Sequence, residues 1–274
     1  MCRTTTPGSN QEDPDPLKSL PPEIFDKILE FIPATRDGRP TLIACALVAT
    51  WWTAPSQRRL FSSISIHEAN LQRWMDGVAL SESKSHLLAY ARSLWHWRGG
   101  LFGDNYRMRN LPQDSCQYSS ALHNVQNLTL VNFGIEDIGG EGFRTCFSAF
   151  RETLTFLYLE FSGTSFSAFV TLVNYFPNIT ALRLRGVKLE PDEGPVPTLS
   201  RPLRGKIYIE YSHHPGIDCL EFFRRLAKLD LEYEEVVVNF FSLTSSMGID
   251  LLESVLQISP TTIKFLRLLK LEGE

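Results

Sequence analysis

The segment LTFLYL at residues 154–159 decides the fold, because its pattern of one apolar residue, two variable residues and Leu-x-Leu recurs along the chain. VQNLTL at 125–130 and ITALRL at 179–184 match the whole pattern. Three later segments match its second and third apolar positions, namely RGKIYI (204–209), YEEVVV (233–238) and IKFLRL (263–268). Two weaker matches lie upstream, FSSISI (61–66) and ARSLWH (91–96). Short segments of alternating apolar residues predict β-strands.

The spacing of these segments predicts how they assemble. Their second apolar positions lie 25 to 30 residues apart, at Leu128, Leu157, Leu182, Ile207, Val236 and Leu266. Segments of helical character separate them, at 71–90, 141–154, 165–176, 218–229 and 249–259. Strand and helix alternating at this period predict a parallel αβ solenoid with a curved sheet of about six to eight strands. The glycine-rich segment 97–120 and the proline-rich segment 189–205 are expected to be loops.

Strand alternation also predicts which side chains face away from the helices. These outward positions are Phe156, Tyr158, Glu160, Arg183, Arg185, Lys206, Tyr208, Glu210, Glu235, Asn239, Phe265 and Arg267. Aromatic residues interleaved with both signs of charge are typical of protein interfaces. We expect a protein target to bind Tyr158, Arg183, Arg185, Tyr208, Glu210 and Arg267. The alternative is a solvated sheet face whose aromatic rings pack on one another.

The stretch SLPPEIFDKILEFIP at 19–33 predicts a short helix with a wide apolar stripe, opened by two prolines and ended by Pro33. TLIACALVATWW (41–52) predicts a second helix, apolar almost all round and therefore buried on most sides. TAPSQRRLF (53–61) predicts a third helix, with Pro55 in its first turn. Three helices of about 45 residues in total make a marginal core. We therefore expect the stripe to bury partly against another surface.

The same stretch resembles an F-box. The positions of the family pattern are occupied here by Leu20, Pro21, Glu23, Ile24, Ile28, Leu29, Leu42, Cys45, Val48 and Trp52. The ending APSQRRLF (54–61) is similar to that of fungal F-box proteins, in which an array like a leucine-rich repeat typically follows. Ala49 departs from the pattern, because many members carry Ser or Cys there. On this resemblance we expect an α+β protein with a disordered tail (1–16), an all-α F-box (17–62) and a leucine-rich-repeat-like solenoid (63–274).

The resemblance implies a substrate-recognition subunit of a Skp–cullin–F-box ubiquitin ligase. The ten F-box positions would bind the Skp adaptor and, through it, the cullin, while the repeats would bind a protein target. Such a subunit is non-catalytic, monomeric outside the complex, and found in the cytoplasm, the nucleus or both. Two alternatives stay open. One is a protein-binding scaffold without a ligase, in which the helices cap the solenoid; the other is a small-molecule receptor with a deep pocket at the repeat face.

Composition and motifs exclude several other classes. A net charge of −4 gives no basic footprint for nucleic acid. No apolar run reaches the roughly 18 residues of a membrane helix, and residues 1–16 lack the apolar region of a secretory signal. The five cysteines form no CxxC and are expected to be reduced thiols. The sequence holds no catalytic or phosphate-binding motif, and His213-His214 has no further ligands at metal-site spacing, so we expect no cofactor, metal or catalysis.

Overall fold

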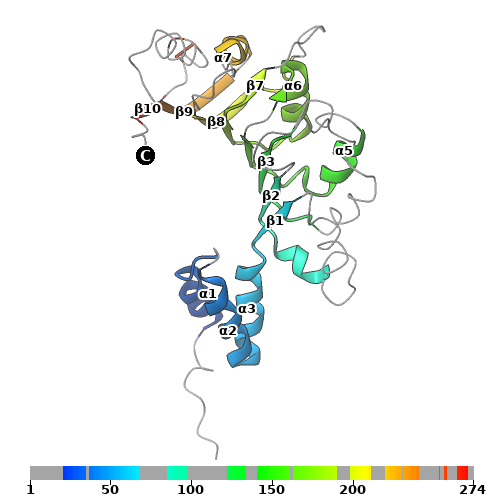
Figure 1. Cartoon of the computed structure of the whole chain (residues 1–274), viewed down its shortest axis with the longest axis vertical. Coiled ribbons are helices and arrows are strands. Elements are labelled where there is room, and N and C mark those ends of the chain that lie inside the picture. Colours follow the sequence, from blue (N-terminus) through cyan, green and yellow to red (C-terminus); the bar gives the residue numbers. More distant parts are fainter. Residues whose placement is uncertain are drawn as a thin grey trace, which may run out of the picture. The chain divides into compact units, whose positions relative to one another are not determined.

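A computed structural model of the chain describes residues 21–34, 37–67, 85–97, 122–133, 141–160, 163–189, 198–210, 220–229, 231–240, 253, 256–257 and 264–270. The chain divides into two compact units, Met1–Leu60 and Phe61–Glu274. The described part of the first unit is helical, and that of the second is a parallel sheet with helices between its strands (Figure 1). The expected tail at 1–16 lies outside the described residues.

The first unit contains the three expected helices, α1 (Pro22–Glu30), α2 (Arg39–Val48) and α3 (Thr50–Leu60). The predicted boundary between the second and third helices is wrong. Ala49 is extended, so α2 ends at Val48, Trp51 and Trp52 belong to α3, and Pro55 lies inside α3 instead of in its first turn. The Thr53 hydroxyl donates a 3.0 Å hydrogen bond to the carbonyl of Ala46, which a continuous helix would have bonded to a backbone N–H.

A small aromatic core holds α1 to α3. Phe25 and Leu29 lie one turn apart on α1 and are both buried. The ring of Phe25 contacts Trp51 at 4.4 Å and Trp52 at 5.2 Å between centroids. Leu42 contributes the buried side chain of α2. One face of α1 is thus committed to the interior of the unit.

The second unit contains a sheet of eight strands whose spatial order follows the chain and whose neighbouring pairs are all parallel. The strands are β1 (Ser63–His67), β2 (Ser93–Trp97), β3 (Asn127–Val131), β4 (Phe156–Glu160), β6 (Ala181–Arg185), β8 (Leu203–Glu210), β9 (Leu231–Phe240) and β10 (Phe265–Lys270). The two-residue strands β5 (Gly163–Thr164) and β7 (Lys188–Leu189) pair separately. All eight predicted strands are confirmed, and the expected α+β class with a parallel sheet holds.

The predicted repeat positions pair across the sheet in one row, from Leu128 through Leu157, Leu182, Ile207 and Val236 to Leu266. Ile64 and Leu94 extend the row to the two weaker matches. A segment spacing of 25 to 30 residues therefore corresponds to one step across the sheet.

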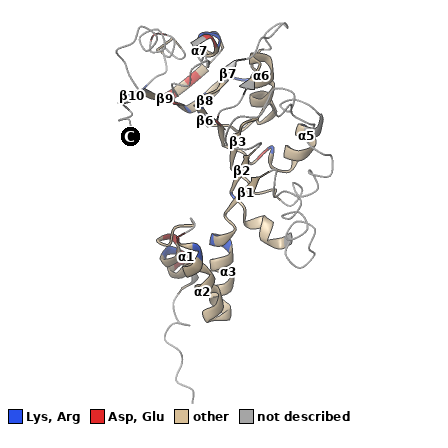
Figure 2. Cartoon of the chain, viewed as in Figure 1, with Lys and Arg blue, Asp and Glu red and all other residues tan. Residues whose placement is uncertain are grey.

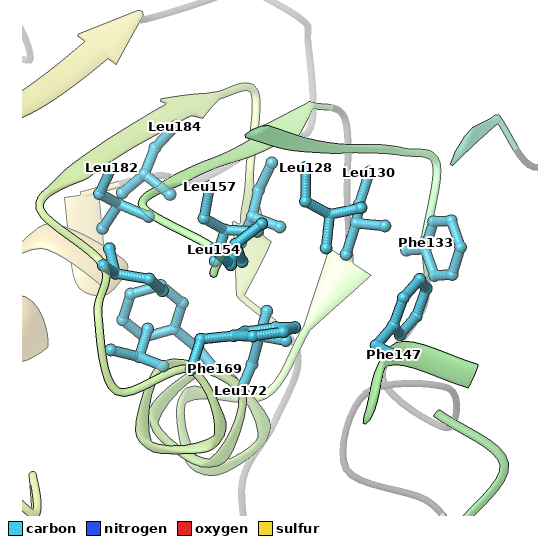
Figure 3. Close-up of a cluster of buried hydrophobic side chains, with 14 of the residues drawn as sticks. Leu128, Leu130, Phe133, Phe147, Leu154, Leu157, Phe169, Leu172, Leu182 and Leu184 are labelled. Atoms are coloured by element: carbon cyan, nitrogen blue, oxygen red, sulfur yellow. The ribbon is translucent and has the colours of Figure 1, made fainter. Parts of the chain in front are cut away.

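Helices cover the core side of the sheet and contribute large aromatic residues to it (Figure 3). They are η4 (Ser85–Tyr90), α5 (Glu141–Phe147), η8 (Ser148–Phe150), α6 (Phe166–Tyr175) and α7 (Leu220–Leu226), of which η4 and η8 are 3-10 helices. Phe147 and Phe169 are buried in one cluster with the leucines of β3, β4 and β6. The Ser165 hydroxyl caps α6 by accepting from the N–H of Ala168 at 3.0 Å. The apolar residues of strands and helices thus share a continuous core.

Polar side chains connect several strand–helix repeats to the repeat that precedes them in the chain. The Asn124 amide donates to the carbonyl of Ala89 at 2.8 Å, the Thr153 hydroxyl to that of Val125 at 2.8 Å, and the Asn178 amide to that of Glu152 at 2.6 Å. These bonds satisfy backbone carbonyls in the segments that connect helices and strands. They also keep successive strand–helix repeats aligned.

Some sequence expectations need correction or fall outside the described residues. Residues 203–205 begin β8 and are not part of a loop, because Leu203 pairs with Leu231 ahead of a bulge at Gly205/Lys206. Cys146 is buried in the core as expected, but it is disulfide-bonded, so the expectation of reduced thiols is wrong there. Residues 71–84, 98–120 and 190–197, and most of 249–259, are not described.

Candidate functional site

The helical unit exposes a group of large apolar side chains, here called the apolar helical surface. It consists of Ile24 (45% exposed), Ile28 (42%) and Phe31 (87%) with Ile43 (50%), Leu47 (81%) and Val48 (76%). Isolated apolar residues are common on protein surfaces, but six in two adjacent short segments are not. This group is the first candidate site.

Helical geometry explains why the surface forms. Ile24, Ile28 and Phe31 follow the i, i+4, i+7 spacing of one helix face, while Phe25 and Leu29 lie on the next face and are buried. α1 is therefore apolar on two faces, one of which packs on α3. The expectation that α2 is buried on most sides is wrong for this chain. Leu42 is the only large apolar residue of α2 that is buried.

The residues expected to bind an adaptor fall into several classes. Pro21, Glu23, Ile24, Ile28 and Val48 are exposed, Cys45 and Trp52 are half-buried, and Leu29 and Leu42 are buried inside the unit. Leu20 lies outside the described residues. The sequence reasoning did not select Phe31, Ile43 and Leu47, although the spacing of Phe31 from Ile24 and of Leu47 from Ile43 would have indicated them.

The second candidate site is the outward face of the large sheet, which is formed by three rows of residues in register on the side opposite the core. The first row runs Ser63, Ser93, Asn127, Phe156, Ala181, Lys206, Glu235 and Phe265. The second runs Ser65, Trp95, Thr129, Tyr158, Arg183, Tyr208, Val237 and Arg267. The third runs His67, Trp97, Val131, Glu160, Arg185, Glu210 and Asn239.

Charge is unevenly distributed on this face. β1, β2 and β3 carry no Lys, Arg, Asp or Glu, whereas β4, β6, β8, β9 and β10 all carry at least one (Figure 2). The uncharged part carries a run of nearly parallel rings, with Trp97 stacked on His67 at 5.3 Å and on Trp95 at 6.5 Å between centroids. The face therefore has an aromatic part and an ionic part.

A network of ion pairs crosses β4, β6 and β8. Arg185 pairs with Glu160 at 2.9 Å, and Glu210 contacts both Arg185, at 3.7 Å, and Arg183. The guanidinium of Arg183 lies over the Tyr158 ring, 4.7 Å from its centroid. Burial, together with the charge of Glu160, raises the pKa of Tyr158 to about 12. The network thus fixes the orientation of two arginine side chains on one strand.

A second group of ion pairs joins β8, β9 and β10. Glu235 accepts from Lys206 at 2.8 Å and lies 3.8 Å from Arg267. The hydrogen bond to Lys206 lowers the pKa of Glu235, and the same bond raises the pKa of Lys206. Lys206 and Arg267 thus both contact the same carboxylate, that of Glu235.

The residues expected to bind a target differ in accessibility. Arg183, Arg185 and Arg267 are partly or largely exposed, Tyr208 is half-buried, and the Glu210 side chain is only 12% exposed. Tyr158 is outward-facing but 5% exposed, because Trp95 and Arg183 cover its ring. Trp95, at 36% exposed, was not selected from the sequence, although its place two residues before Trp97 on a strand indicated a shared face.

No protein-family model matches the chain, and it has no match among curated proteins. Across the described residues, no helix is both long enough and apolar enough to cross a bilayer. Nor does that part of the chain gather three or more His, Cys, Asp or Glu residues in a group that could hold a metal ion. His213 and His214 lie outside it. The two surfaces above are thus the features from which a function can be argued.

Proposed function

We propose that the chain is the non-catalytic substrate-recognition subunit of a Skp–cullin–F-box ubiquitin ligase. The apolar helical surface binds the Skp adaptor, and the outward sheet face binds the protein that is to be ubiquitylated. The chain's contribution to the reaction is proximity, because holding a target near the conjugating enzyme raises its effective concentration.

The observation that carries the proposal is the double apolar character of α1. Its inner face is already occupied, since Phe25 and Leu29 pack within the unit, yet Ile24, Ile28 and Phe31 remain exposed beside it. Covering apolar area yields about 25 cal/mol per Å², so six such side chains favour association with an apolar partner. An adaptor that offers apolar helices would supply that second partner.

The resemblance to an F-box supports the same partner. Of the ten pattern positions, Ile24, Ile28 and Val48 lie on the apolar helical surface, and Leu29 and Leu42 hold the helices that present it. The pattern therefore contains both residues that would touch the adaptor and residues that shape the surface.

Co-expression of the full chain with a Skp adaptor, followed by size exclusion, tests the proposal. We expect a one-to-one complex that Ile24→Asp abolishes, because the buried interface would leave the new carboxylate unpaired. Glu30→Ala is the matched control, since Glu30 lies on the polar face of the same helix and its carboxylate pairs with the exposed Lys27. The control variant should still form the complex.

A well-folded wild-type chain that ignores the adaptor would contradict the ligase function and favour a scaffold. Equal loss of binding in Ile24→Asp and Glu30→Ala would show that the apolar helical surface is not the contact.

A further inference from the structure

In the ion pairs that join β4, β6, β8, β9 and β10 on the outward face, the carboxylate is more deeply buried than the cation. The carboxylates lie underneath, with side chains 10% exposed at Glu160, 12% at Glu210 and 13% at Glu235. The cations lie above them, with side chains 40% exposed at Arg183, 43% at Arg185, 54% at Lys206 and 66% at Arg267. These four residues are called the cation cluster. A molecule that approaches this face meets positive groups first.

This order differs from that of the other ion pairs on the same sheet. Arg204 pairs with Glu232, whose side chain is 37% exposed, and Lys264 pairs with Glu234, which is 60% exposed. There both charges face the solvent, so an approaching molecule meets both signs. The cation cluster thus presents one sign of charge on a chain whose net charge is −4.

The buried carboxylates also orient the cations. Glu210 holds Arg183 and Arg185, which lie two residues apart on β6 and so point the same way. The ring of Tyr158 supports the guanidinium of Arg183 from below. Each guanidinium carries five N–H donors and can therefore bond more than one acceptor. A guanidinium whose orientation is fixed can donate two parallel hydrogen bonds to the two oxygens of a carboxylate.

We propose that the cation cluster binds a carboxylate-rich segment of the protein target, that is, a segment rich in Asp or Glu. This inference rests on the proposed function in taking the outward face as the target-binding surface. Arg183 and Arg185 contact the segment's carboxylates directly, and Lys206 and Arg267 extend the contact toward β10. Glu210 acts as a positioning residue, because it holds the two arginines and is itself covered by them.

The test is the binding of a fluorescein-labelled octaglutamate peptide to the full chain, followed by fluorescence anisotropy. We expect saturable binding that weakens as salt rises from about 0.05 to about 0.5 M, since screening shortens the reach of the cations. A Gly/Ser peptide of equal length should not bind. Arg183→Gln combined with Arg185→Gln should weaken octaglutamate binding by about tenfold or more.

The matched control is the pair Arg204→Gln and Lys264→Gln, which removes the same number of charges from the same sheet. It should change binding by less than about twofold, because Glu232 and Glu234 are themselves exposed there and repel the carboxylates of the peptide. Arg267→Gln is a milder variant that keeps the proposal testable if the first variant fails to fold. It leaves the Arg183–Glu210 contact intact and should also weaken octaglutamate binding. Equal weakening by the control pair would overturn the proposal, and so would equal binding of the Gly/Ser peptide.

Glu210→Gln separates positioning from simple charge. Removing a negative charge would tighten binding of octaglutamate if Glu210 acted only through its field, whereas loosening of the two arginines weakens it. We expect weaker binding; tighter binding would overturn the positioning role. Binding of a phosphoserine peptide or a single-stranded RNA, with octaglutamate unbound, would overturn the assignment to carboxylates.

The adaptor experiment on the wild-type chain separates the two proposals. Failure of the wild-type chain to bind octaglutamate while it forms a normal adaptor complex would overturn this inference and leave the ligase function standing. Normal octaglutamate binding by a chain that does not bind the adaptor would overturn the ligase function and leave this inference standing.

Discussion

The ring of Trp95 in β2 meets the ring of Tyr158 in β4 edge to face, with centroids 6.5 Å apart, across the intervening strand β3. Because neighbouring strands lie about 4.8 Å apart, both rings must lean over β3 to make this contact. Thr129, which lies between them on the outward face, is consequently only 3% exposed. Tyr158 is therefore part of a local packing arrangement on the outer side of the sheet.

Replacement of Tyr158 by alanine should destabilise the sheet unit by about 2–4 kcal/mol, because it removes a buried ring that Trp95 and Arg183 pack against. Tyr208→Ala is the matched control, since Tyr208 lies in the same row but is half-buried. It should leave folding and adaptor binding intact and weaken target binding. Urea unfolding of both variants measures the difference, and a larger loss at Tyr208 would contradict the packing described here.

Alkaline pH should also destabilise the fold through Tyr158. Its pKa is about 12 in the folded chain, compared with an ordinary value of 10. The folded state therefore holds the phenol proton more tightly than the unfolded state, so this stability is complete below pH 10 and is lost as pH rises toward 12. We expect a fall of about 1–2 kcal/mol in unfolding free energy.

Urea unfolding on either side of this pH range measures the fall. Tyr158→Phe keeps the ring but cannot ionise, so its unfolding free energy should fall less steeply. Tyr233, whose pKa is also raised by burial, is present in both proteins and contributes equally. Identical pH slopes would show that the environment of Tyr158 does not oppose ionisation.

Two phenylalanines of the helical unit should respond in opposite ways to alanine substitution. Phe25→Ala removes a ring that packs on Trp51 and Trp52, and should destabilise the unit by about 3–5 kcal/mol. Phe31→Ala truncates a side chain that is 87% exposed, and should change stability by less than about 0.5 kcal/mol while weakening adaptor binding. Hydrogen exchange of the α1 and α3 amides reports the local stability. Strong deprotection in Phe31→Ala would mean that Phe31 has an internal partner.

Substitution of Gly205 by alanine should destabilise β8 by more than about 2 kcal/mol. Gly205 has a φ of +100°, and an added Cβ would lie 2.1 Å from the backbone carbonyl oxygen of Thr180. Because both the dihedral and the contact involve backbone, no side-chain movement can relieve them. Thermal unfolding should show this loss, whereas Arg204→Ala, at the exposed neighbouring position, should cost less than about 0.5 kcal/mol. Similar melting of the two variants would contradict the bulge geometry.

Periodicity accounts for the part of the fold that was predictable. The Leu-x-Leu spacing placed the strands, and Leu128, Leu157 and Leu182 do pair in one row. Prediction failed where a segment carried no distinguishing period. The segment 41–52 is apolar on nearly every side, so its pattern could not show that the chain becomes extended at Ala49. A bulge beginning at Gly205 was likewise hidden in a proline-rich segment.

By itself, the sequence determined which residues lie on the same face of a strand or helix, because that follows from local backbone geometry with a fixed period. Only the tertiary structure decided which of those residues solvent can reach. Tyr158 and Arg183 both face outward, yet the first is covered and the second is partly exposed, because side chains from β2 and β6 close over Tyr158. In the same way, tertiary packing set Glu160, Glu210 and Glu235 beneath their cations. Coverage depends on neighbours that are distant in the chain, and no local period encodes their positions.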